Sequence, residues 1–204
     1  ADSSLARNKN KKFNVIFILA DDLGWTDLGL YGSDLHETPN LDRFASESLR
    51  FTSAYTAASI SSPVRASLMT GKHPARLNMT TWHEDSGPPD PNTKYKLLPP
   101  ETGGNLPLDQ FSLGEVFKKA GYFTAHIGKW HLGNAVHYPE AQGFDINIGG
   151  TMWGMPYTYW YPFSGWRAVD NEYRYVPDLV VMDSDNEGTY LTDRLTDKAL
   201  EVIE

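Results

Sequence analysis

The stretch Asn14-Val-Ile-Phe-Ile-Leu-Ala-Asp-Asp22 decides how the rest of the chain is interpreted. Its apolar part, residues 14–20, is uninterrupted and rich in β-branched side chains, which is typical of a buried strand in a parallel sheet. The run stops at Asp21 and Asp22, which would then lie at the carboxyl edge of that sheet. Ligands of α/β proteins bind at this edge. The stretch therefore predicts an α/β fold with two carboxylates near a binding site.

Strands and helices alternate along the remainder of the chain. The expected strands are 51–56 and 122–127, and the expected helices run from Pro63 to Gly71, after Ser112-Leu-Gly-Glu115 and over 191–202. Proline suits the first turn of a helix, a Ser-x-x-Glu capping box starts one, and glycine ends one. This alternation predicts an α/β fold with a mostly parallel sheet flanked by helices. The last helix has no stop signal, so we expect the fold to be incomplete in this chain.

Composition excludes several classes of protein. With 204 residues, 40% of them hydrophobic and 13% aromatic, the chain is too apolar to be disordered. A net charge of -8 argues against a nucleic-acid partner, which would require basic patches. No apolar run approaches the ~18 residues of a membrane span. The absence of cysteine excludes disulfides, thiolate zinc sites and a cysteine nucleophile.

Two segments carry side chains suited to anion or metal chemistry. Asp21 and Asp22 offer the oxygen ligands that Ca²⁺ or Mg²⁺ prefers, although such a pair is also common in an ordinary turn. Ser61, followed by Pro63 and Arg65, stands at a helix N-terminus, where free N–H groups and a guanidinium favour a sulfate or phosphate. An ordinary capped helix with a surface arginine fits the same residues.

A third segment places Lys129 and His131 just after the expected strand 122–127. If the segment is extended, side chains two apart point to the same side, where they could bind an anion and protonate a leaving oxygen. A turn with exposed polar residues is the alternative. Each segment is a weak signal by itself, but all three follow expected strands. One sheet edge would therefore bring them together into an active site.

Together, these segments resemble the type I, formylglycine-dependent sulfatases of the alkaline phosphatase superfamily. The family signature is Cys or Ser, any residue, Pro, any residue and Arg, with Thr-Gly further along; here it is Ser61-Ser-Pro-Val-Arg65 with Thr70-Gly71. Val64 replaces the commoner Ser at a variable position. The other matching segments, in family order, are Ile18-Leu-Ala-Asp-Asp22, Thr38-Pro-Asn40, Gly121-Tyr-Phe-Thr124, Gly128-Lys-Trp-His-Leu-Gly133 and Gly143-Phe-Asp145. The resemblance implies an alkaline phosphatase-like fold.

The resemblance also implies catalytic roles. Ser61 would be oxidised to formylglycine by a formylglycine-generating maturation enzyme, and Arg65 would stabilise the formylglycine hydrate. Lys129 would hold the sulfate, and His131 would support the formylglycine hydroxyl. One hydroxyl of the hydrate would attack sulfur, and the other would then lose its proton and expel sulfate. An unmodified serine has no second hydroxyl, which is why the modification matters.

By the same resemblance, Asp21, Asp22 and Ser61 would bind one Ca²⁺. These residues fall short of the ~6–8 oxygen ligands that calcium takes, so further ligands are expected beyond residue 204. We therefore expect the chain to be the N-terminal part of a sulfatase catalytic domain that needs the remainder of the polypeptide for activity. Within it we expect a loose arm and two long loops or insertions, over residues 1–12, 84–107 and 152–175.

The function that follows from the resemblance is hydrolysis of a sulfuric ester in a sulfated small molecule or glycan. Trp and Tyr crowd residues 152–175, and such side chains suit sugar rings, although packing of the insertion explains them equally. The family implies a role in glycan degradation and a periplasmic or secreted location. Two alternatives stay open: a phosphatase or phosphoryl-transfer enzyme of the superfamily that uses unmodified Ser61, and a non-catalytic glycan-binding fragment.

Overall fold

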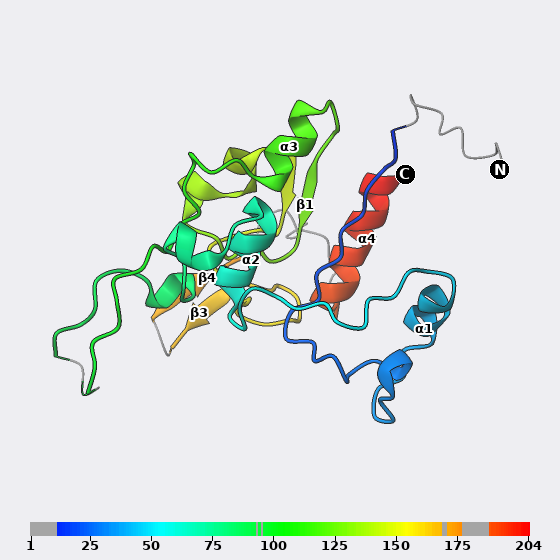
Figure 1. The fold of residues 1–204 in the computed structure, drawn as a ribbon, viewed down its shortest axis with the longest axis horizontal. Coiled ribbons are helices and arrows are strands. Elements are labelled where there is room, and N and C mark those ends of the chain that lie inside the picture. The colour runs from blue at the N-terminus through cyan, green and yellow to red at the C-terminus, as the bar shows by residue number, and fades with distance from the viewer. Residues whose placement is uncertain (1–11, 93, 95, 169–170, 177–187) are drawn as a thin grey trace. The chain divides into compact units, whose positions relative to one another are not determined.

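The computed structural model describes residues 12–92, 94, 96–168, 171–176 and 188–204. It forms two compact units, residues 1–54 and 55–204, drawn as one ribbon in Figure 1. Of the arm expected over residues 1–12, all but Lys12 lies outside the described residues. Among the described residues, none of the helices combines the length and the apolar character that crossing a bilayer requires.

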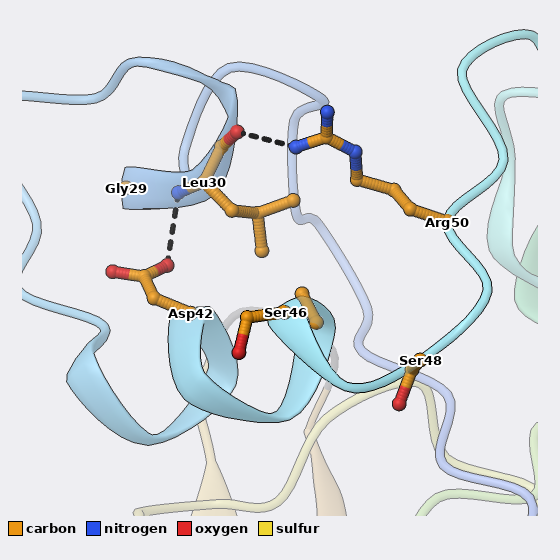
Figure 2. Close-up of a pocket in the computed structure, with 7 residues that line it drawn as sticks. Gly29, Leu30, Asp42, Ser46, Ser48 and Arg50 are labelled. Atoms are coloured by element: carbon orange, nitrogen blue, oxygen red, sulfur yellow. Dashed lines mark hydrogen bonds between the residues drawn. The ribbon is translucent and has the colours of Figure 1, made fainter.

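The first unit is organised around a short helix, α1 (Pro39–Ser46). The Thr38 hydroxyl accepts from the Gly29 amide at 2.9 Å, and the Asp42 carboxylate accepts from the Leu30 amide at 2.9 Å. Arg50 donates to the Leu30 carbonyl at 3.0 Å, so the turn η2 (Gly29–Tyr31) is held from two directions (Figure 2). Asp42 and Arg50 are among the residues that line a hollow of about 580 Å³.

The strand expected over residues 14–20 is not formed. Its backbone is irregular and its side chains are exposed, with Ile18 87% and Ile16 65% accessible. A strand exists only where a neighbouring strand takes up its backbone N–H and C=O groups. None of the described residues forms a ladder with this run, so the prediction is wrong for this structure. The strand expected over residues 51–56 is absent for the same reason.

The helices of the second unit begin and end where local signals predict. Helix α2 (Ser61–Thr70) has proline in its first turn and ends at Gly71, whose φ of 66° is left-handed. Helix α3 (Leu113–Lys119) starts at the capping box, in which the Ser112 hydroxyl accepts from the Glu115 amide at 3.1 Å. Helix α4 (Leu191–Ile203) covers the expected range, and Tyr190 is its N-cap residue.

A parallel pair of strands packed by helices gives this unit its α/β character. Strand β1 (Ala125–Ile127) occupies the second half of the range expected over 122–127 and pairs in parallel with β2 (Ile146–Ile148). Helix α4 packs against β1, and α2 packs against α3. The prediction of an α/β fold is confirmed. The parallel part of the sheet has two strands among the described residues.

An antiparallel hairpin lies inside residues 152–175, the range expected to be a long loop or insertion. It joins β3 (Gly165–Arg167) to β4 (Glu172–Arg174), with Trp166 opposite Tyr173. The loop 84–107 carries no strand among its described residues, apart from one isolated bridge between Gly87 and Thr102. The other elements of the unit are single turns of 3-10 helix: η3 (Pro74–Leu77), η4 (His83–Asp85), η5 (Ala135–His137) and η6 (Pro139–Gln142).

Two hydrophobic clusters support these elements. The larger one buries side chains of α2, η3, the segment after β1 and two loop positions, namely Ala66, Leu77, Met79, Leu106, Trp130 and Leu132. Trp130 is 1% exposed and donates its indole N–H to the His137 carbonyl at 2.9 Å. The smaller cluster joins Phe163 and Val176 to Leu191 at the start of α4. The larger cluster therefore anchors α2 and the segment 128–133 to each other.

Candidate active site

Ser61 lies in the first turn of α2, and its hydroxyl lies within hydrogen-bond distance of two side-chain nitrogens. The Nε of Arg65 donates to Ser61 Oγ at 3.2 Å, and Nδ1 of His131 lies 3.1 Å from the same oxygen. Arg65 is one helical turn after Ser61 and only 8% exposed. Its Nη1 donates to the Lys129 carbonyl at 2.7 Å, which orients the guanidinium. The anion-binding residues predicted on the helix are thus assembled around one hydroxyl.

His131 adopts a backbone conformation that the sequence did not predict. Its φ is 60°, so the segment after β1 is not extended at this residue, and simple alternation with Lys129 does not hold. Left-handed backbone is unfavourable for a residue with a Cβ and persists where the surroundings impose it. Here the His131 amide donates to the Thr151 carbonyl at 2.9 Å. The Ser62 hydroxyl donates to the His131 carbonyl at 2.8 Å.

Ser62 connects the two sides of the site. Its side chain is fully buried, and its Oγ accepts from the His83 amide at 3.2 Å while it donates to His131. The His83 ring is held in turn, because its Nδ1 lies 2.7 Å from the Gly104 carbonyl. A single hydroxyl next to Ser61 therefore fixes both the segment of His131 and the turn η4.

Glu84 is the residue of the site that sequence reasoning missed. Its Oε2 lies 2.6 Å from Nε2 of His131, and its Oε1 accepts from the Gly154 amide at 3.1 Å. Glu84 and His131 are 47 residues apart, and Glu84 stands in a polar loop without periodicity. No local pattern marks it, so only the folded chain shows this contact.

Burial and mutual contact shift the pKa values of Glu84 and His131. Burial acts to raise the pKa of Glu84, but the hydrogen bond and charge of His131 outweigh it and lower that pKa to about 2. Burial lowers the pKa of His131, with Glu84 opposing and the positive charges of Lys129 and Arg65 adding to the decrease. At neutral pH Glu84 is therefore an ionised carboxylate.

The structure brings together four of the predicted site residues. Ser61, Arg65 and His131 are linked by the hydrogen bonds above, and Lys129 is half-buried and close enough for its charge to act on the imidazole. Asp21 and Asp22 belong to the first unit, so their distance from Ser61 is not defined. The hollow at Arg50 is also in the first unit and is lined by none of these residues (Figure 2).

The carboxylates of Asp21 and Asp22 are ligands that suit a hard cation. Asp21 and Asp22 supply adjacent carboxylates, and Asp22 has a left-handed backbone with φ of 55°. Within the described ranges, no group of three or more His, Cys, Asp or Glu side chains is arranged to hold a metal ion. Calcium binding therefore stays a prediction for Asp21, Asp22 and Ser61.

Gly154 packs directly on the His131 ring. A methyl group added at Gly154 would lie 2.6 Å from Cε1 and 2.9 Å from Nε2 of that ring. Because the ring is rigid and buried, we expect Gly154→Ala to destabilise the full-length protein by about 1–3 kcal/mol, as overpacking does. Urea unfolding measures this cost.

The control makes the same substitution in a variant that lacks the imidazole ring. In a His131→Ala background the added methyl group meets no imidazole, so Gly154→Ala should cost far less there. An equal cost in both backgrounds would show that the clash lies elsewhere.

The arrangement suits nucleophilic attack on an oxyanion ester. Ser61 presents a hydroxyl with a hydrogen-bonding imidazole beside it, and the carboxylate of Glu84 lies behind that imidazole. Arg65 places a cation beside the same oxygen, and the charge of Lys129 acts on the neighbouring imidazole; such cations favour a tetrahedral anion. A base, an orienting group and cations around one hydroxyl are the parts of a covalent hydrolytic mechanism.

Comparisons with known proteins agree with this geometry. The family model described as "Sulfatase" matches residues 13–204. N-acetylgalactosamine-6-sulfatase of Rattus norvegicus is 41% identical over 137 residues, which is 67% of this chain and 25% of that protein. Arylsulfatase G of the same species is 41% identical over 146 residues, which is 71% of this chain and 24% of that protein. The chain thus spans about a quarter of the length of the curated relatives it matches.

Solved structures also resemble the described fold. The crystal structure titled "Ps i-CgsB" has a TM-score of 0.68 at 27% identity and covers 91% of this chain and 40% of that one. The same protein in complex with k-i-k-neocarrahexaose has a TM-score of 0.66 at 27% identity, covering 90% of this chain and 39% of that one.

Proposed function

Because this chain belongs to the sulfatase family, we propose that the protein of which it is part hydrolyses sulfuric esters and releases inorganic sulfate. The observation that carries the proposal is the Ser61 hydroxyl, held in the first turn of α2 between Arg65 and His131. Ser61 occupies the position at which the family signature places the residue that becomes formylglycine. The alkaline phosphatase-like fold supports the proposal.

Formylglycine at position 61 is the finer part of this proposal. When oxidised by a maturation enzyme and hydrated, this residue supplies two hydroxyls on one carbon, one to attack sulfur and one to release sulfate afterwards. Arg65 donates to the oxygen at this position and is fixed there by the Lys129 carbonyl. His131 can accept or return a proton at Nδ1, 3.1 Å away. Lys129 adds positive charge for the sulfate oxygens.

We propose a sulfated carbohydrate as the substrate. One relative is named N-acetylgalactosamine-6-sulfatase, and one similar structure was solved with k-i-k-neocarrahexaose, an oligosaccharide by its name. Several aromatic side chains of the insertion are partly exposed, including Tyr157 at 47% and Tyr159 at 44%. Exposed aromatic faces suit sugar rings. A periplasmic or secreted location belongs to the same proposal, and cell fractionation tests it.

Calcium is the metal that the proposal includes, with Asp21, Asp22 and Ser61 as its expected ligands. The ion would polarise the sulfate ester as a Lewis acid, which contributes several kcal/mol to transition-state stabilisation. We therefore expect a chelator, or Asp21→Asn together with Asp22→Asn, to lower kcat/KM by more than ~100-fold. Calorimetric titration of the full-length protein with Ca²⁺ should show weaker binding by the double variant.

The matched control for the metal is Asp34→Asn, an exposed aspartate of the same unit. This variant removes one negative charge without touching the expected ligands, so its Ca²⁺ affinity and activity should equal those of the wild type. Unchanged Ca²⁺ affinity in the double variant would contradict the assignment of Asp21 and Asp22.

One observation favours a second candidate function, phosphoryl transfer by unmodified Ser61. The His131 ring stands within hydrogen-bond distance of the hydroxyl and can take its proton, as an unmodified serine nucleophile requires. Tetrahedral phosphate and sulfate present similar oxygens to Arg65 and Lys129. The family assignment favours the sulfate ester.

The test is the mass of the tryptic peptide Phe51–Arg65 from full-length protein made in its native host. Loss of two hydrogens at Ser61 would support formylglycine and the sulfatase proposal. An unmodified serine, together with faster hydrolysis of 4-nitrophenyl phosphate than of 4-nitrophenyl sulfate, would favour phosphoryl transfer. An unmodified serine in a protein that hydrolyses neither the sulfate nor the phosphate ester would contradict both candidate functions.

A further inference from the structure

The two long loops of the second unit meet at the His131 ring. Glu84 comes from the loop 84–107, and Gly154 comes from the insertion 152–175. Glu84 Oε2 lies 2.6 Å from Nε2 of His131, and Oε1 accepts from the Gly154 amide at 3.1 Å. Both carboxylate oxygens are therefore engaged next to the ring nitrogen that faces away from Ser61. The proposed function assigns Glu84 no role.

We propose that Glu84 is a positioning residue, which keeps the proton of the His131 imidazole on Nε2 and its Nδ1 turned toward position 61. This inference rests on the proposed function only in that Ser61 carries the reacting group. It concerns which nitrogen of the ring bears the proton and how the ring is oriented.

The hydrogen-bonding capacity of each group decides which ring nitrogen carries the proton. An ionised carboxylate only accepts hydrogen bonds, so the contact at 2.6 Å requires a proton on Nε2 of His131. A neutral imidazole has one N–H, so Nδ1 then carries the lone pair. That lone pair lies 3.1 Å from Ser61 Oγ, where it can accept the hydroxyl proton. Glu84 thereby makes Nδ1 the acceptor without touching the reacting oxygen.

The opposite tautomer would change what the Ser61 hydroxyl can donate to. With its proton on Nδ1, His131 would donate to Ser61 Oγ, whose other lone pair accepts from Arg65 Nε at 3.2 Å. The hydroxyl proton would then have no acceptor on the imidazole. A carboxylate behind a metal-bound imidazole fixes the tautomer in the same way, and loss of such a partner typically costs about 10- to 100-fold in metal affinity or activity.

The backbone of the site holds Glu84 and His131 in register. The buried Ser62 hydroxyl accepts from the His83 amide and donates to the His131 carbonyl. His83 immediately precedes Glu84, and its ring is anchored on the Gly104 carbonyl at 2.7 Å. The two residues that form the contact are thus tied to one hydroxyl next to Ser61. The Glu84 side chain is only 27% exposed, which limits competition from water.

The test compares Glu84→Gln, Glu84→Asp and Asp85→Asn in the full-length protein. Glutamine keeps the shape of Glu84 but can donate as well as accept, so it no longer selects one tautomer. Aspartate keeps the carboxylate. Asp85 is the exposed neighbour in the same turn η4, and its replacement removes an equal charge away from the ring.

Two measurements distinguish positioning from a purely structural role. With 4-nitrophenyl sulfate, Glu84→Gln should lower kcat about 10- to 100-fold and leave KM within about twofold. Glu84→Asp should restore part of kcat, and Asp85→Asn should behave as the wild type. Nitrogen-15 NMR of histidine-labelled protein should show the His131 proton on Nε2 in the wild type and shared with Nδ1 in Glu84→Gln, with His131→Gln used to assign the signal.

Unchanged kcat and an unchanged tautomer in Glu84→Gln would overturn the proposal, as would a wild-type ring with its proton on Nδ1. If Glu84→Gln does not fold, Glu84→Asp decides: a tautomer shared with Nδ1 in that variant would contradict the role of the carboxylate. The NMR measurement needs no substrate. It therefore remains decisive for Glu84 even if the enzyme is found to prefer phosphate esters.

Discussion

Replacing Ser61 with alanine is expected to abolish hydrolysis of sulfate esters by the full-length protein, with kcat falling at least ~1,000-fold. Arg65 and His131 both contact the Ser61 oxygen. Alanine has no oxygen to be oxidised or to attack sulfur, so the remaining residues retain only their ability to bind the anion. Release of sulfate from 4-nitrophenyl sulfate measures the loss.

The matched control is Ser67→Ala, the same substitution in the same helix α2. Ser67 takes part in the helix through its carbonyl, which accepts from Gly71, and this bond survives the change. Its activity should stay close to that of the wild type, and both variants should unfold at similar urea concentrations. Activity of Ser61→Ala within tenfold of the wild type would refute the assignment of Ser61 as the nucleophile position.

Replacing Trp130 with alanine should produce the largest loss of stability in the second unit. The indole is 1% exposed and packs edge-on against His126 and Phe144, with ring centroids 5.1 Å and 6.1 Å away. Its N–H donates to the His137 carbonyl, which would lose this partner. Removal of a buried tryptophan costs about 3–5 kcal/mol, so the free energy of unfolding should fall by this amount.

Trp166→Ala is the control, because that side chain is 64% exposed on strand β3. Its loss should cost about 1 kcal/mol or less, as is usual for surface positions with a single ring contact. Urea unfolding of the full-length variants compares the two costs. Similar costs for Trp130 and Trp166 would contradict the packing of Trp130 against His126 and Phe144.

The loss of Trp130 should also reach the site. Lys129 and His131 are the residues directly before and after Trp130 in the sequence. The carbonyl of Lys129 orients Arg65. A displacement of about 1 Å in such groups can cost about 100-fold in rate, so kcat should fall even where Trp130→Ala remains folded.

The sequence by itself determined the features that depend on neighbours a few residues away. The capping box of Ser112 and Glu115 and the left-handed glycine at Gly71 appear in the structure as predicted. These signals act within one helical turn, so they are readable from residues next to each other. The signature at Ser61 and Arg65 is of the same kind, because one turn of helix brings both to the same oxygen.

Only the tertiary structure decided the features that depend on distant partners. Residues 14–20 have the composition of a buried strand, yet they form none, because a strand requires hydrogen bonds from another segment. The left-handed backbone of His131 is imposed by Thr151 and Ser62, which no local pattern links to it. Glu84 reaches His131 across 47 residues for the same reason. Hydrogen bonds between distant residues form only when the chain has folded, and these bonds set the geometry of the site.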